Sequence, residues 1–106
     1  MREQMADVIN STRRDLEGFV LRLADLSGMD FTRCNLKDAD LREARLDSAI
    51  FREADLRGAK LNRVVAVGSS FDGANLMAAS LTFGNFSGSS FRGVNFRIVH
   101  VGYANF

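Results

Sequence analysis

The sequence predicts an all-β solenoid in which the chain winds into a four-sided tube. Three observations support this: a large apolar residue recurs at every fifth position, a small residue recurs two positions before it, and residues of one kind recur at a spacing of 20. At 106 residues the chain is long enough for one domain and too short for two separate cores. We therefore expect residues 15–106 to form a single solenoid domain.

The large apolar residue returns without a break from Leu16 to Phe106, and 17 of these 19 positions are Leu or Phe. Five residues advance an α-helix by about 500° and reverse the face of a flat strand. Neither element could keep these side chains on one side. The chain must therefore turn a corner in every repeat, so that each Leu or Phe points back to a common axis.

The other positions of the repeat are equally regular. The residue two before the large one is mostly small, the residue between them is usually Asp, Asn or Ser, and seven of the nine glycines lie two residues after the large one. Such recurrent Asp and Asn side chains are typical of hydrogen bonds to nearby backbone groups. The repeat departs from this pattern at Val64–Val67, where Ala66 takes the place of the large residue, and we expect thin packing there.

The number of repeats in one coil follows from which residues stack, because neighbouring coils should place similar residues on one another. Phe31, Phe51, Phe71 and Phe91 lie 20 residues apart, whereas a spacing of 15 mixes Leu and Phe. Four repeats per coil, giving about 4.5 coils of 20 residues, is the better interpretation.

This pattern resembles the pentapeptide-repeat family, whose consensus A(D/N)LXX is matched by Ala39–Leu41, Ala54–Leu56, Ala74–Leu76 and, with Phe for Leu, Ala104–Phe106. The resemblance covers residues 14–106. It implies a right-handed quadrilateral β-helix, and the handedness comes from the resemblance alone. Residues 1–14 stand apart: Met1, Met5, Val8 and Ile9 share one stripe of a short helix over about residues 2–13, which could cap the first coil. A frayed leader is the alternative.

The sequence offers little catalytic chemistry. His100 is the only histidine and occupies an outward position, and Cys34, the only cysteine, belongs to the inward series of small residues, where a packed thiol is expected. One His and one Cys do not make a zinc site. We predict no enzymatic activity, no catalytic residue, no metal site and no cofactor.

Charge and hydropathy bear on location and partners. The formal net charge is +1, and residues 1–63 hold 12 of the 14 basic and 12 of the 13 acidic side chains. Acidic and basic residues are interleaved, so nucleic acid is an unlikely partner. No apolar run is long enough for a membrane span or a signal peptide, and a single cysteine needs no oxidising compartment, so we expect a cytoplasmic protein.

Outward apolar residues provide the main functional clue, and they gather in the C-terminal half. We predict a non-enzymatic interaction or scaffold module, because exposed apolar patches often mark contact sites. The alternative is a set of scattered surface residues without a partner. The predicted partner-binding residues are Met77, Phe83, Ile98 and Tyr103, and those predicted to join two copies end to end, as a homodimer through the C-terminal end, are Phe91, Phe96 and Phe106.

Two further functions remain open. Some pentapeptide-repeat proteins imitate duplex DNA and act on type II topoisomerases such as gyrase, but that role calls for a strongly negative rod. Direct nucleic-acid binding would use Arg22, Arg42 and Arg63, and the case is weakened by the acidic residues among them, which are Asp40, Glu43 and Asp47.

Overall fold

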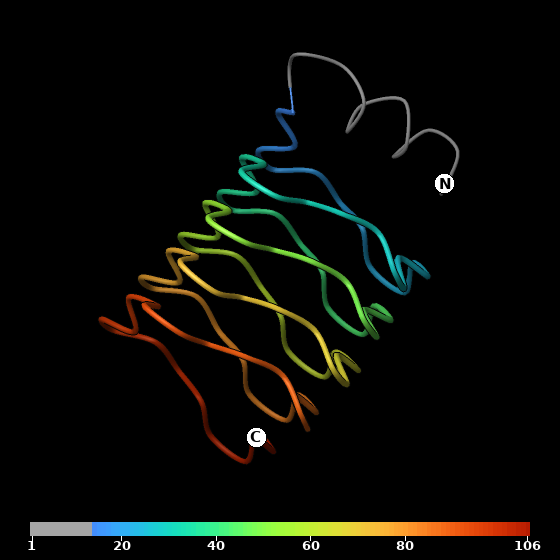
Figure 1. The fold of residues 1–106 in the computed structure, drawn as a ribbon, viewed down its shortest axis with the longest axis vertical. Helices are drawn as coiled ribbons and strands as arrows, with labels where there is room; N and C mark the ends of the chain where they lie inside the picture. Colours follow the sequence, from blue (N-terminus) through green and yellow to red (C-terminus); the bar gives the residue numbers. More distant parts are fainter. Residues whose placement is uncertain (1–13) are drawn as a thin grey trace.

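The computed structural model describes residues 14–106, which wind into a stack of coils along one axis (Figure 1). The described chain turns after every three-residue extended segment, so each coil of 20 residues has four walls and four corners. Residues 14–106 contain no helix, and each extended segment contributes a single bridging residue instead of a longer strand. The helix predicted over about residues 2–13 lies outside the described residues.

Parallel bridges hold the coils in register. Each joins a residue to the residue 20 positions later, from Asp15 with Asn35 to Asn85 with Asn105. The bridging residue is the one that precedes the large apolar residue, so the Asp, Asn and Ser of the repeat form the middle of each wall. Residues on either side of it therefore point inward, as expected where successive side chains alternate between the two faces of an extended chain.

Backbone hydrogen bonds link every coil to the next at both walls and corners. The N–H of Leu21 donates to the carbonyl of Asp40 at 2.7 Å, and the N–H of Asp40 donates back to the carbonyl of Phe19 at 2.9 Å. At the adjoining corner the N–H of Leu23 donates to the carbonyl of Arg42 at 3.1 Å. The stack thus satisfies the buried peptide groups that so small a cross-section would otherwise leave unpaired.

Each corner is a four-residue turn closed by one hydrogen bond. In the turn that begins at Leu16, the N–H of Phe19 donates to the carbonyl of Leu16 at 3.0 Å, and the third residue, Gly18, has φ of 71°. A positive φ at this position is characteristic of a type II turn and favours glycine. Because the repeat demands it at every corner, non-glycine residues such as Glu43 and Phe83 also adopt φ near 61°.

The Asp and Asn side chains satisfy the one turn N–H that the backbone ladder does not reach. The N–H of the second turn residue donates to a side-chain oxygen two residues earlier: the N–H of Thr32 donates to Asp30 at 2.9 Å, and the N–H of Met77 donates to Asn75 at 3.1 Å. These are the local side-chain-to-backbone bonds that the sequence predicts. These bonds explain why Asp or Asn recurs in this position and the longer Glu and Gln do not.

In two repeats that lack Asp or Asn, a side chain of the preceding coil supplies the oxygen. Val65 cannot accept a hydrogen bond with its side chain, and Asp47 accepts the N–H of Val67 at 3.0 Å instead. Asp72 does the same for Arg92, at 2.9 Å, in the repeat that has Ser90 in this position. The departure at Val64–Val67 is therefore compensated across coils, and the same segment gains a further link through the buried Ser69, whose hydroxyl donates to the carbonyl of Leu46 at 2.6 Å.

The core is a set of parallel columns of large and small side chains. The rings of Phe31 and Phe51 stack at 4.9 Å between centroids, Phe51 and Phe71 also at 4.9 Å, and Phe71 and Phe91 at 5.0 Å. The sequence predicts this column, and the structure contains it. The small residues between the columns, such as Ala39 and Ala54, are buried as well, so large and small side chains share the interior.

Two substitutions measure how much the positive φ at the third turn position lowers the free energy of unfolding when a residue other than glycine occupies it. Gly68 has φ of 68° and no atom within 4 Å of an added Cβ, so Gly68→Ala should lower the free energy of unfolding by about 1 kcal/mol through backbone strain alone. Ala78 already has φ of 62°, and Ala78→Gly should leave stability unchanged or raise it by less than about 1 kcal/mol. Urea denaturation would measure both. Equal losses in the two variants would contradict the strain argument.

Candidate interaction surface

Each turn presents two consecutive side chains to the outside, so every corner of the tube carries a double column of outward residues. One of these corners, here named the groove corner, combines the basic and the aromatic residues singled out in the sequence. Its residues are Arg22, Leu23, Arg42, Glu43, Asn62, Arg63, Thr82, Phe83, Gly102 and Tyr103.

The aromatic end of the groove corner is a stacked pair. The rings of Phe83 and Tyr103 lie 5.0 Å apart and within 10° of parallel. Their side chains are held outward by the turns, and 50% of Phe83 and 85% of Tyr103 remain exposed. An amphipathic aromatic pair on a rigid backbone loses little conformational freedom on binding, which is a property of contact residues.

Arg63 continues this column toward the N-terminal coils. Its guanidinium carbon lies 4.6 Å from the centre of the Phe83 ring, which is a cation–π contact. Phe83 therefore has Arg63 on one face and Tyr103 on the other. The sequence places these residues 20 apart, but only the structure shows that the charge and the rings form one continuous column.

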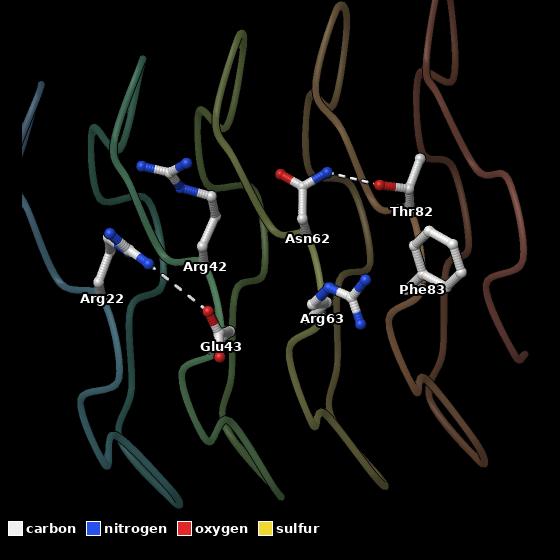
Figure 2. A pocket seen from close by; sticks show the side chains of 7 residues that line it. All are labelled: Arg22, Arg42, Glu43, Asn62, Arg63, Thr82 and Phe83. Atoms are coloured by element: carbon white, nitrogen blue, oxygen red, sulfur yellow. Dashed lines mark hydrogen bonds and ion pairs between the residues drawn. The ribbon is translucent and has the colours of Figure 1, made fainter.

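Beside this column lies an open groove with a volume of about 440 Å³. Figure 2 shows its side chains rising from four successive coils, with Asn62 and Thr82 next to Arg63 and Phe83. The residues that line it are Arg22, Arg42, Glu43, Asn62, Arg63, Thr82 and Phe83. The structure thus brings together two sets that the sequence analysis assigned to different functions, the three arginines and the exposed phenylalanine.

Two of the three arginines have carboxylate partners. Arg22 lies 3.5 Å from the carboxylate of Glu43, and both side chains are nearly half exposed (Figure 2). Arg42 contacts Asp40 through two nitrogens, Nε at 2.8 Å and Nη2 at 2.7 Å. These hydrogen bonds from Arg42 lower the pKa of Asp40 to about 2, so the pair stays ionised at neutral pH.

Polar side chains rigidify the middle of the groove. The amide nitrogen of Asn62 donates to the hydroxyl of Ser80 at 2.5 Å. It also donates to the hydroxyl of Thr82 at 2.6 Å, as Figure 2 shows. Sequence reasoning missed Asn62 and Thr82. Their spacing of 20 could have identified them, because it places an amide next to a hydroxyl on neighbouring coils.

The other predicted contact residues lie at the next corner of the tube. Met77 is partly buried, Ile98 is 70% exposed, and a wall centred on the bridge between Ser80 and His100 separates their corner from the groove corner. Phe83 and Tyr103 therefore touch each other, whereas Met77 and Ile98 would take part only if a partner covered the intervening wall. Exposed apolar residues are also not confined to the C-terminal half, because the first described coil exposes Phe19, Val20 and Leu23.

The last described coil presents an apolar end. Phe91 is partly buried and stacks on Phe71, while Phe96 is 43% exposed and Phe106 is 55% exposed. The ring of Phe106 stacks on that of Phe86 at 5.4 Å. These three predicted self-association residues therefore share one end of the stack of coils.

The cysteine and the histidine lie where the repeat places them. Cys34 is fully buried, and burial raises the pKa of its thiol, so the prediction of a packed thiol is confirmed. His100 is exposed, as its outward position predicts. Residues 14–106 contain no group of three or more His, Cys, Asp or Glu side chains that could hold a metal ion. Within the same residues, no helix has the length and apolarity to cross a membrane.

Comparison with known proteins gives a consistent result. The sequence model of pentapeptide repeats matches residues 15–47, 24–63 and 59–97, with eight copies of the repeat. No curated protein sequence is similar enough to count as a relative.

Two solved structures illustrate the similarity. The pentapeptide repeat protein alr5209 from Nostoc Pcc 7120 is 31% identical, with a TM-score of 0.80 over 82% of this chain and 72% of that one. A trypsin-treated form of QnrB1, a plasmid-mediated fluoroquinolone resistance protein, is 23% identical, with a TM-score of 0.53 over 85% of this chain and 59% of that one. The second likeness concerns the fold alone.

Proposed function

This chain belongs to the pentapeptide-repeat family, with its right-handed β-helix, and from that premise we propose that it is a non-enzymatic protein-interaction module that contacts its partner through Phe83 and Tyr103. The stacked, outward-facing pair of these two rings is the observation that carries the proposal. Met77 and Ile98, at the next corner, extend the proposed contact surface across one wall. A cytoplasmic location remains part of the proposal.

The rigidity of the backbone supports this role. Both aromatic residues occupy the third position of a turn, with φ of 61° for Phe83 and 59° for Tyr103, and each turn is tied to its neighbour by the bond from the Phe83 N–H to the Gly102 carbonyl at 3.0 Å. The rings are therefore presented in a fixed orientation before a partner arrives. Binding then costs less conformational entropy than it would on a mobile loop.

Imitation of DNA is less well supported. A DNA-like surface needs rows of carboxylates that remain uncompensated, and here Asp40 pairs with Arg42, Asp55 with Arg57 and Glu53 with Arg33. Each of these pairs has a nitrogen and an oxygen within 3.0 Å of each other. These three carboxylates are therefore compensated, and an interaction through aromatic and apolar contacts is better supported than imitation of DNA.

The experiment that tests the proposal removes both rings while respecting the turn. In the variant Phe83→Asn, Tyr103→Asn, asparagine tolerates the positive φ, so the fold should persist, with a free energy of unfolding in urea that is unchanged to within about 1 kcal/mol. We expect this variant to lose the protein that the unaltered chain retains in affinity capture from its native host. Binding of that protein, once purified, should weaken at least tenfold in calorimetry, since aromatic residues are frequent hot spots.

Ser48→Asn is the matched control, because Ser48 lies in the same turn position with φ of 58° at a different corner. It should bind as the unaltered chain does. If the double variant captures and binds the same protein with unchanged affinity, the aromatic pair is not the contact surface.

We also propose that a second copy covers the apolar end formed by Phe91, Phe96 and Phe106. Parallel sheets end in unpaired peptide groups, and exposed apolar side chains beside them favour association. Light scattering should then give a dimer at tens of micromolar, and Phe96→Asp should give a monomer. A monomeric unaltered chain under these conditions would refute the end-to-end contact.

A further inference from the structure

We propose that the groove corner binds an acidic segment of the partner protein, with Arg63 holding an incoming carboxylate. This inference rests on the proposed function and names the chemistry that the partner must carry. Arg22 has Glu43 as its partner and Arg42 has Asp40, whereas the contact described for Arg63 is the Phe83 ring. Arg63 therefore forms no ion pair with a carboxylate among residues 14–106, so its positive charge is available to a ligand.

The contact with Phe83 restricts the Arg63 side chain before a carboxylate binds. The guanidinium carbon of Arg63 lies over the ring, 4.6 Å from its centre, and a guanidinium presents its N–H donors as a planar fork. Such a planar fork matches the two oxygens of a carboxylate. Because the contact with Phe83 already restricts the side chain, less rotamer freedom is lost when the anion binds.

The spacing of the coils fits an extended peptide. Parallel extended segments lie about 4.8 Å apart, so Arg22 and Arg63, two coils apart, are separated by roughly 10 Å along the axis. In an extended chain, side chains two residues apart point to the same face and are separated by about 7 Å. Two such acidic side chains could therefore reach both arginines, because the long arginine side chains can cover the remaining distance. The Arg22–Glu43 pair, which is long and half exposed, costs little to exchange.

The groove also offers a hydrogen-bond acceptor to a peptide. The amide nitrogen of Asn62 is used by Ser80 and Thr82, while its carbonyl oxygen receives no hydrogen bond from the part of the chain that the structure describes. That oxygen points away from Thr82, toward the coil that carries Arg42, which is another residue that lines the groove (Figure 2). A peptide N–H in the groove would satisfy it.

A nucleic acid fits the same groove less well. Both faces of Phe83 are covered, by Arg63 and by Tyr103, so no base can stack between them. Asp40 and Glu43 lie among the arginines and would repel a phosphate backbone, which carries a charge at every nucleotide.

The test uses the full chain and a fluorescein-labelled hexaglutamate peptide, followed by anisotropy at low ionic strength. We expect saturable binding that weakens about tenfold in Arg63→Gln, because a charge-assisted pair is lost. Phe83→Asn should weaken it severalfold by releasing Arg63. The control is Arg33→Gln, which removes the same charge from the same turn position, with φ of 59° against 60° for Arg63, and should change the affinity less than about twofold.

Three results would overturn the proposal: no binding of hexaglutamate, equal weakening by Arg33→Gln and Arg63→Gln, or tighter binding of an oligothymidylate that carries the same number of charges. The proposed function is judged separately, by partner capture with the Phe83→Asn, Tyr103→Asn variant. A chain that captures its partner through these rings yet ignores hexaglutamate would disprove only the role of Arg63.

Discussion

Replacing Phe71 with alanine should lower the free energy of unfolding by about 3–5 kcal/mol, which is a large fraction of the stability of a domain of this size. Phe71 is fully buried, its ring stacks on Phe51 at 4.9 Å and on Phe91 at 5.0 Å, and its edge meets Phe86 at 5.8 Å. Alanine would leave a cavity in the middle of the column that the rigid walls cannot close. Urea denaturation followed by circular dichroism would measure the loss.

Because Phe71→Ala could fail to fold altogether, Phe71→Leu provides a milder variant, with an expected loss of about 1 kcal/mol. Phe83→Ala is the control for a phenylalanine outside the core, since half of its surface is exposed, and it should cost less than about 1 kcal/mol. A soluble Phe71→Ala variant that melts cooperatively with an unchanged midpoint would contradict the stacked core.

Gly84→Ala should destabilise the fold by about 1–3 kcal/mol through overpacking. A Cβ at this position would lie 2.4 Å from Cε2 and 3.0 Å from Cζ of the Phe86 ring, and 3.1 Å from the carbonyl oxygen of Leu81. The Phe86 ring cannot easily move, because it is buried and has Phe71 and Phe91 at its edges and Phe106 on its face. The expected loss of stability comes from this steric conflict, because Gly84 has no positive φ that alanine would have to adopt.

Gly102→Ala is a well-matched control for this effect. It also lacks a positive φ, and the nearest atom to its added Cβ is Cγ2 of Thr82 at 3.8 Å, so its free energy of unfolding should change by less than about 0.5 kcal/mol. The double variant Gly84→Ala, Phe86→Leu should recover part of the loss relative to the sum of the single variants. Strict additivity would show that the added methyl does not meet the ring.

Much of the fold could be predicted because the sequence repeats with the geometry. The column of Phe31, Phe51, Phe71 and Phe91 needed only the observation that similar residues lie 20 apart and that stacked coils place them together. The hydrogen-bonding role of Asp30 and its equivalents also followed from residue type, since short acids and amides bond to the backbone two residues on.

The compensation at Val65 could not be predicted in this way. The bond from the Val67 N–H to Asp47 joins residues 20 apart, and it depends on a side chain reaching across to the next coil instead of along its own. The sequence shows an Asp at that spacing without showing which of several backbone groups it contacts.

The candidate site was only partly predictable. Its residue types and outward positions follow from the repeat, and Phe83 and Tyr103 were identified on that basis. The contact of Arg63 with Phe83 depends on a side-chain torsion that no spacing specifies. The polar links from Asn62 to Ser80 and Thr82 were missed for the same reason, and the exposed Phe19 shows that an inward position does not guarantee burial at an end coil.

The uniform register has a consequence for how such a chain can change its length. Since every bridge spans 20 residues, removing or duplicating one whole coil preserves the inward columns and the ladder, whereas any other insertion slips every later side chain out of its column. Loss of residues 44–63, for example, would set Phe83 directly above Glu43. Deletion or duplication of a whole coil therefore changes which outward side chains are neighbours, while the pattern of inward side chains remains the same.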